Sequence, residues 1–292
     1  VLFFQPKANL RNGDIVGFEA LIRWQHPQRG LLAPAEFLHF MDGSELEVLV
    51  GEWVIDTVLR QMALWSRAGI DSKVSANVSA DHLLRDSFAQ RLRLILERYP
   101  EVAPERLELE ILETAALADM KKAVETITQC RNLGVQFALD DFGTGYSSLT
   151  YFLNLPVQLL KIDQSFVRMM LEDPGGLGIV ESVVRLAQAF NRPVIAEGVE
   201  TLEHGSMLLY FGCYLAQGYG ISRPMPADQV GLWLQTWKAD QSWRRMVTPA
   251  VDQDVTLQVA AQSHRAWVDK VTRQGTQLDG DSIIEADSNI CS

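Results

Sequence analysis

Acidic side chains recur where short apolar segments of this chain end. The set comprises Glu19, Asn77, Glu110, Asp140, Asp141 and Glu197, of which Asn77 contributes an amide oxygen. Adjacent carboxylates such as Asp140 and Asp141 repel each other in a partly buried site unless they are protonated or neutralised by a cation. Hard oxygen ligands favour Mg²⁺ or Mn²⁺, and the five histidines show no ligand spacing. The pattern therefore predicts a Mg²⁺ or Mn²⁺ site with all-oxygen ligands.

Two ions at such a site would suit phosphodiester hydrolysis. A carboxylate that bridges ions about 3.5–4 Å apart lets them polarise a phosphodiester and generate hydroxide, and Asp140 is the natural bridge. Lys161 lies in the apolar segment Leu159–Asp163, where a charge costs free energy unless it has partners such as these carboxylates or a phosphate. A single acidic residue at the end of a strand often only helps to form a turn. The repeated occurrence of acidic residues at successive strand ends favours a functional site.

The elements that must position these residues alternate between strands and helices. The predicted strands are Val16–Trp24, Lys73–Val78, Arg106–Leu112, Val135–Leu139, Leu159–Asp163 and Pro193–Glu197, and helical spacing marks Glu47–Trp65 and Leu177–Phe190. In Leu107–Ile111 the period of two places Glu110 on the inner face. Such alternation, with polar residues at strand ends, fits a TIM-like (β/α)8 barrel better than a doubly wound sheet, since no Gly-rich dinucleotide fingerprint follows the first strands.

Composition limits the classes of function. The 292 residues carry a net charge of -11, which argues against binding of a nucleic acid polymer. The three cysteines, Cys130, Cys213 and Cys291, are widely spaced and indicate neither a disulfide framework nor a metal site. No apolar run is long enough to span a membrane, and no signal peptide is visible, so the fragment is predicted to be cytoplasmic without membrane contact.

Several sequence blocks resemble the EAL domain of cyclic di-GMP phosphodiesterases. The matching blocks are Gln5-Pro6, Phe18–Trp24 with Glu19-Ala20-Leu21, Asn77-Val78-Ser79, Glu110–Glu113, Asp140–Gly145, Lys161-Ile162-Asp163, Ala196–Glu200 and Gln217-Gly218-Tyr219. They run in family order through residues 1–240. Leu112 replaces the more frequent Thr of its block, and no catalytic position is missing.

The resemblance implies an enzyme and assigns roles to its residues. The expected fold is a modified TIM barrel with one antiparallel strand, and the expected reaction opens cyclic di-GMP to linear pGpG. Glu19, Asn77, Glu110 and Asp140 would hold one metal ion, and Asp140 and Asp141 the other. Lys161, Glu197 and Gln217 would orient or deprotonate water. Gln5, Leu21 and Arg23 match nucleotide-contacting positions, although Leu21 could equally be a core residue.

Glu113 matches the glutamate that positions the loop Asp141–Leu149, which the family uses in metal binding and dimer contacts. The resemblance thus implies a homodimer. It also implies flanking sensory or diguanylate-cyclase-like domains in a longer protein.

The ends of the chain depart from the family pattern. The chain starts too late to supply the helix that usually precedes the Gln5 strand, and a boundary is predicted near residue 240, followed by a C-terminal extension over 241–292. His264–Trp267 faintly resembles the start of a zinc-binding chemoreceptor module, but the later histidines of that module are missing. A linker helix over Val255–Val271 is therefore the preferred interpretation.

Two other classes of function compete with hydrolysis. The barrel could sense cyclic di-GMP and transmit the signal with little turnover. It could also be a Mg²⁺-dependent lyase or racemase with Lys161 as base.

Overall fold

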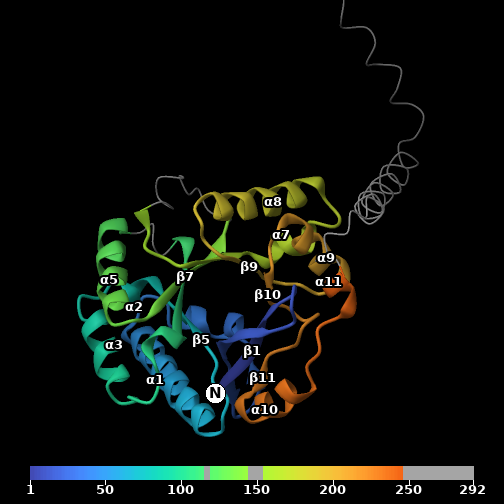
Figure 1. Cartoon of the computed structure of the whole chain (residues 1–292). Coiled ribbons are helices and arrows are strands. Elements are labelled where there is room, and N and C mark those ends of the chain that lie inside the picture. The colour runs from blue at the N-terminus through green and yellow to red at the C-terminus, as the bar shows by residue number, and fades with distance from the viewer. Residues whose placement is uncertain (115–118, 144–153, 246–292) are drawn as a thin grey trace, which may run out of the picture. The chain divides into compact units, whose positions relative to one another are not determined.

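Eight strands close into a barrel in the computed structural model, which describes residues 1–114, 119–143 and 154–245 (Figure 1). Along the barrel wall the order is β1, β2, β5, β6, β7, β8, β9 and β10, and a β10–β1 pairing closes it. The sheet is closed, as in the predicted (β/α)8 barrel and unlike a doubly wound sheet. The barrel strands are β1 Leu2–Asn9, β2 Ile15–Ile22, β5 Val74–Val78, β6 Leu107–Leu112, β7 Gln136–Phe142, β8 Leu159–Ile162, β9 Val194–Ala196 and β10 Leu215–Ala216.

Strand β1 runs antiparallel to both of its neighbours, which confirms the modified barrel. It pairs with β2 from Leu2↔Ile22 onward and with β10 at Ala8↔Ala216. The connection to β2 is a tight hairpin in which Gly13 has a φ of 84° and its N–H donates to the Asn9 carbonyl at 2.7 Å. Such a short turn permits only an antiparallel neighbour, because a parallel one needs a crossover. A ninth strand, β11 Met225–Pro226, adds to β1.

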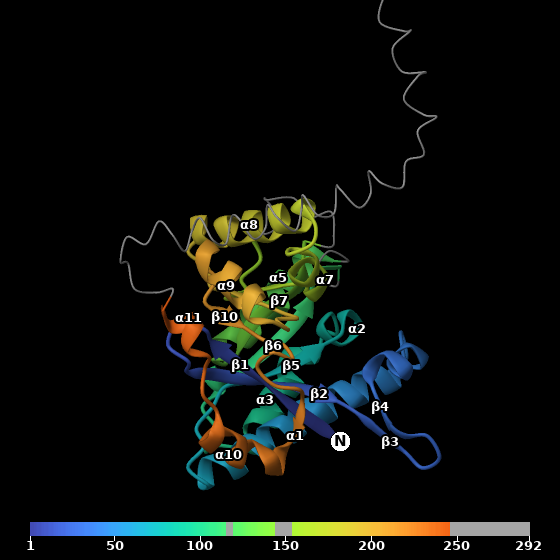
Figure 2. The same cartoon turned by 90° about the vertical axis from the view of Figure 1, so that its right-hand side faces the viewer.

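Helices pack around this barrel in both views (Figures 1 and 2). Val54, Val58, Met62 and Trp65 of α1 are buried, as its apolar spacing predicts. Pro174 occupies the first turn of α8, and Asp173 accepts from Gly175 N at 3.0 Å, so this helix begins three residues before its predicted start. The helices are α1 Glu45–Arg67, α2 Ala80–Leu83, α3 Phe88–Leu96, α5 Met120–Asn132, α7 Gln164–Met169, α8 Pro174–Ala189, α9 Leu202–Phe211, α10 Ala227–Thr236 and α11 Gln241–Arg245.

Short elements complete the part of the chain that the structure describes. A hairpin of β3 Trp24–His26 and β4 Gly30–Leu32 extends away from the barrel in Figure 2. Three 3₁₀ turns are η1 Pro34–Glu36, η2 Leu38–Phe40 and η3 Pro104–Arg106.

The barrel wall separates an apolar layer under the helices from an interior that holds charged side chains beside a small apolar cluster. In β6, Leu107, Leu109 and Ile111 are all fully buried on the helix-facing side. Glu110 points to the other side, where lysines from β1 and β8 contact it. The period of two in this strand therefore produces the predicted orientation of Glu110.

Helix α11 begins one residue past the boundary predicted near residue 240. Trp243 is buried, and its indole N–H donates to the Leu202 carbonyl of α9 at 3.1 Å. The boundary stays a prediction. The predicted helix Val255–Val271, the rest of the C-terminal extension from residue 246, and most of the loop Asp141–Leu149 lie outside the described residues. None of the described helices has the length and apolarity needed to cross a membrane.

Candidate active site at the C-terminal end of the barrel

The predicted site residues gather at one end of the barrel because the strands that carry them run in the same direction. Strands β2, β5, β6, β7, β8, β9 and β10 are parallel neighbours, so their carboxyl ends meet at one mouth. From these ends come Glu19, Asn77, Glu110, Asp140, Lys161, Glu197 and Gln217. Gln5 reaches the same mouth from antiparallel β1, directly opposite Glu19 in the register.

Lys161 lies at the centre of the carboxylates and is fully buried. Its Nζ is 2.5 Å from Glu110 Oε2 and 2.5 Å from Glu197 Oε1. Asp140 Oδ2 lies 3.0 Å from the same nitrogen and Glu19 Oε2 3.9 Å from it. A buried ammonium is tolerated only with such partners, which is the reason the sequence singled out this lysine.

Glu19 is held by side-chain amides on both sides. Asn77 Nδ2 donates to its Oε1 at 2.8 Å, and Gln217 Nε2 donates to its Oε2 at 2.6 Å. Gln217 Nε2 also lies 3.1 Å from Gln5 Oε1, and Gln5 donates in turn to the Ser222 carbonyl at 3.0 Å. These bonds fix the orientation of the Glu19 carboxylate and link strands β1 and β2 to the segment that follows β10.

A break in strand pairing brings Asp140 and Asp141 to the site together. The β7–β8 register shifts between Leu139 and Phe142, so adjacent residues need not alternate between the two faces of the wall. Asp141 has a φ of 53°, a left-handed backbone that is uncommon outside glycine, and its N–H donates to Asp140 Oδ1 at 2.9 Å. Backbone strain of this kind is concentrated at functional sites.

Glu113 supports the segment that follows these aspartates. Its carboxylate is buried and accepts the Gly143 N–H at 3.0 Å. The contact lies at the first residues of the loop that Glu113 is predicted to position, and this role stays a prediction. The rest of that loop, from residue 144, lies outside the described ranges.

Burial and mutual repulsion raise the pKa of three of the carboxyl groups. Burial, with repulsion from Glu110 and Asp140, raises the pKa of Glu19 to about 7, and burial raises the pKa of Glu197 to about 8 despite the attraction of Lys161. Burial and the charge of Asp140 raise the pKa of Asp141 to about 7. Such shifts are typical of sites that bind cations or move protons.

Glu110 and Lys161 behave in the opposite way. Burial alone would raise the pKa of Glu110, but Lys161 and Lys7 lower it far below its usual range. Burial alone would lower the pKa of Lys161, but Asp140 and Glu110 raise it well above its usual range. Glu110 is therefore ionised and Lys161 charged at neutral pH.

The donor set fits a divalent cation. One oxygen each from Asp140, Asp141 and Glu197 lies within 4.8 Å of the other two, a spacing at which a single ion could contact all three. Gln217 Oε1 is buried, and no donor among the described residues bonds it, so it can accept a bond from water or a ligand. All of these ligands are oxygens, as Mg²⁺ and Mn²⁺ prefer. Glu197, predicted to manage water, thus joins the possible metal ligands.

A cleft of about 200 Å³ opens beside the carboxylates and is lined by the predicted substrate residues. Gln5, Leu21 and Arg23 form part of its wall. Leu21 is half-buried there, so it is no core residue. Arg23 is also half-buried, and its Nη1 donates to the Ile22 carbonyl at 2.8 Å, which leaves other guanidinium N–H groups for a ligand. Tyr219 and Arg168 line the cleft as well.

Lys7 was missed by the sequence reasoning. It is buried on β1, and its Nζ lies 2.7 Å from Glu110 Oε1 and 2.8 Å from Glu108 Oε1. The signal was present, since a lysine in the apolar run Leu2–Ala8 needs a partner for the same reason as Lys161.

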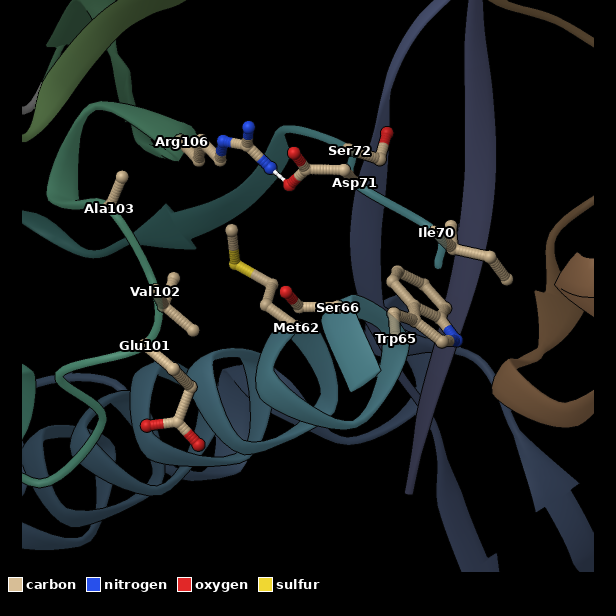
Figure 3. A pocket seen from close by; sticks show the side chains of 10 residues that line it. All are labelled: Met62, Trp65, Ser66, Ile70, Asp71, Ser72, Glu101, Val102, Ala103 and Arg106. Atoms are coloured by element: carbon tan, nitrogen blue, oxygen red, sulfur yellow. Dashed lines mark ion pairs between the residues drawn. The ribbon is translucent and has the colours of Figure 1, made fainter. Parts of the chain in front are cut away.

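A second hollow lies between the end of α1 and the segments that lead into β5 and β6 (Figure 3). Its lining includes Trp65, Met62 and an ion pair between Arg106 and Asp71. These segments precede their strands, so the hollow is at the opposite end of the barrel from the carboxylates. It has no part in the site described above.

The comparisons with known proteins agree with this geometry. The family model for the EAL domain matches residues 1–224. The bifunctional diguanylate cyclase/cyclic di-GMP phosphodiesterase MucR of Pseudomonas aeruginosa is 40% identical over 231 residues, which are 79% of this chain and 34% of MucR. The cyclic di-GMP phosphodiesterase PdeR of Escherichia coli is 38% identical over 238 residues, which are 81% of this chain and 36% of PdeR. The chain thus spans about a third of these relatives.

Solved structures of EAL-domain proteins are also similar to this chain. The structure of the MucR phosphodiesterase in complex with c-di-GMP superposes with a TM-score of 0.76 at 40% identity and covers 79% of this chain and 93% of that one. The FimX EAL domain from Pseudomonas aeruginosa bound to c-di-GMP has a TM-score of 0.70 at 27% identity and covers 82% and 92%.

Proposed function

The chain belongs to the EAL domain family, and from this premise we propose that it hydrolyses cyclic di-GMP to linear pGpG with the help of two Mg²⁺ or Mn²⁺ ions. One observation carries the proposal. A set of buried carboxylates converges on Lys161 at the barrel mouth, next to a cleft lined by Arg23. The activities named for MucR and PdeR and the ligand in the MucR structure support the choice of substrate.

The proposed metal ligands are those predicted from the sequence. Glu19, Asn77, Glu110 and Asp140 would hold one ion, and Asp140 and Asp141 would hold the other, with Glu197 close enough to join them. Two ions held by these residues would supply Lewis-acid activation of both the phosphodiester and the attacking water.

The protein groups around the water would manage its protons. In the reaction, water adds to one phosphorus, the bond to the 3′ oxygen breaks, and that oxygen takes up a proton. Glu197 has a pKa raised to about 8, so its carboxyl group can exchange a proton near neutral pH. Lys161 would orient the water, and Gln217 offers its buried Oε1 as an acceptor.

Substrate binding is assigned to the cleft wall. The planar guanidinium of Arg23 suits a bidentate contact with a phosphate, because its N–H fork matches two phosphate oxygens. Leu21 presents a half-exposed apolar surface to a base or sugar, and Gln5 offers a polar contact beside Glu19.

The proposal extends to flanking domains, oligomeric state and cellular compartment. Flanking domains are expected in the full protein, because MucR and PdeR are each nearly three times as long as the matched part. A homodimer is expected from the family. Cys130 and Cys213 are buried and free, as is typical of the reducing cytoplasm.

The test is hydrolysis by metal-stripped protein after addition of Mg²⁺, Mn²⁺ or Ca²⁺. We expect pGpG with Mg²⁺ and Mn²⁺, and inhibition by Ca²⁺, which prefers a looser and larger coordination shell. Glu19→Ala and Asp140→Asn should abolish turnover while circular dichroism shows a retained fold. Glu181→Gln, on the exposed face of α8, is the matched control with unchanged activity.

Three outcomes would contradict the proposal. One is absence of turnover by protein with confirmed metal occupancy. Another is tight binding of cyclic di-GMP without metal that Glu19→Ala leaves unchanged, which would indicate a sensor. Turnover of a carboxylate substrate instead of the dinucleotide would indicate a lyase or racemase.

A further inference from the structure

Two lysines, one on each side, bind the Glu110 carboxylate inside the barrel. Lys161 Nζ lies 2.5 Å from Oε2, and Lys7 Nζ lies 2.7 Å from Oε1. Each oxygen thus has its own ammonium partner, and the two partners come from different strands, β8 and β1. Two charge-assisted bonds at opposite oxygens fix the plane of the carboxylate as well as its position.

Lys7 is itself anchored from the N-terminal side of the barrel. Its Nζ is 2.8 Å from Glu108 Oε1, and Glu108 lies two residues before Glu110 on the same face of β6. Burial alone would lower the pKa of Lys7, but the charges of Glu108 and Glu110 raise it above its usual range, so the ammonium is charged. Lys7 therefore forms a bridge between two glutamates of one strand.

The position of Lys7 separates it from the reacting groups. Gln5, two residues earlier on the same face of β1, contacts Gln217 at the barrel mouth, whereas Lys7 lies one layer deeper. Lys7 also lines a separate hollow inside the N-terminal end of the barrel, which is not the one drawn in Figure 3. It contacts one expected metal ligand from behind and does not line the substrate cleft.

We propose that Lys7 is a positioning residue, which holds Glu110 Oε1 and so fixes the orientation in which the Glu110 carboxylate would bind a cation. The inference rests on the proposed function, because it takes Glu110 as a metal ligand. Groups that hydrogen-bond to a metal ligand from behind typically change metal affinity by about 10- to 100-fold when they are removed.

Simple electrostatics leads to the opposite expectation. A positive charge near a cation site repels the cation, so removal of Lys7 would strengthen metal binding if its charge were all that mattered. Loss of the positioning contact would weaken binding. The sign of the change therefore distinguishes positioning from charge alone.

The experiment measures Mn²⁺ binding to metal-stripped protein by the electron paramagnetic resonance signal of free Mn²⁺, without substrate. We expect Lys7→Met to weaken Mn²⁺ binding by about 10- to 100-fold. The double variant Lys7→Met/Glu108→Gln removes the whole ion pair and leaves no unpaired charge at Glu108. We expect it to show the same loss, whereas charge alone predicts binding close to that of the wild type.

The matched control is Lys73→Met, which removes an exposed lysine at the same end of the barrel and should leave Mn²⁺ affinity unchanged. If Lys7→Met does not fold, the double variant alone decides the result. Unchanged or tighter Mn²⁺ binding by the folded variants would overturn the inference, as would a wild-type protein that binds no Mn²⁺.

Hydrolysis of cyclic di-GMP is measured separately on the same samples. Binding of Mn²⁺ without hydrolysis of the dinucleotide would contradict the proposed function. The result for Lys7 would still stand, because it depends on metal affinity and not on turnover.

Discussion

The ionised Glu19 carboxylate should destabilise the metal-free protein, and a Glu19→Gln substitution should remove that cost. Burial and the charges of Glu110 and Asp140 raise the pKa of Glu19 from 4.5 to about 7. A carboxyl group with a raised pKa binds its proton more tightly in the folded state. Stability is therefore lost as the pH rises from the unfolded pKa toward the folded one.

The size of the effect follows from the pKa shift. At about 1.36 kcal/mol per pKa unit, the ionised group costs about 3 kcal/mol at about pH 8, and less than about 1 kcal/mol at about pH 5, where the folded state still holds the proton. Altered bonds to Asn77 and Gln217 act equally at both pH values. The difference in unfolding free energy between Glu19→Gln and the wild type should therefore change by about 2 kcal/mol, in favour of the variant, from about pH 5 to about pH 8.

Urea denaturation in EDTA, followed by tryptophan fluorescence, measures this difference. Glu181→Gln, which alters an exposed pair with Arg185, should show no such pH dependence. Saturating Mn²⁺ should offset most of this cost in the wild type, because ligand at about 100 times its Kd stabilises the wild type by about 2.7 kcal/mol and the variant cannot bind it equally. The reasoning would be refuted if Glu19→Gln changed the free energy of unfolding equally at both pH values.

Three further substitutions test other parts of the site. Asp140→Asn removes the carboxylate proposed to bridge two ions, so Mn²⁺ titration should show weaker binding and pGpG formation should fall by at least about 100-fold. Arg23→Lys loses the planar fork, so KM for cyclic di-GMP should rise about 10-fold with a smaller change in kcat, measured by steady-state kinetics. Gly218→Ala would place a Cβ 2.1 Å from the Val199 carbonyl oxygen, so the melting temperature should fall by several degrees in calorimetry.

For each of these three substitutions, one result would contradict the prediction. Unchanged Mn²⁺ affinity in Asp140→Asn would remove this residue from the ligand set. A lower kcat at constant KM in Arg23→Lys would place the guanidinium in the chemistry instead of in binding. A wild-type melting temperature for Gly218→Ala would mean that the backbone of Val199 moves aside.

Local sequence patterns were sufficient to predict six of the eight barrel strands, all except β1 and β10, and the direction of single side chains. The alternation in Leu107–Ile111 correctly placed Glu110 inside the barrel, because successive residues of a strand face opposite sides whatever surrounds it. The buried positions of α1 followed from helical spacing in the same way. The signals that act over a few residues were therefore readable without tertiary structure.

The composition of the site was also largely visible in the sequence. Polar residues at the ends of parallel strands must meet at one mouth, so Glu19, Asn77, Asp140 and Glu197 could be grouped before any distance was known. Which of them bind metal or move protons stays a prediction. The chemistry of all-oxygen ligands is a property of residue type and needs no coordinates.

Tertiary structure alone decided which of these groups touch. Closure of the barrel by the β10–β1 pairing brings Gln5 to Gln217, which are 212 residues apart, and brings Lys7 to Glu110. At the shifted β7–β8 register, where Asp141 has a left-handed backbone, carboxylate oxygens of Asp140 and Asp141 lie within 4.8 Å of each other. Contacts across a closed barrel depend on register, bulges and the balance of several buried charges at once, and none of these is encoded within a single strand.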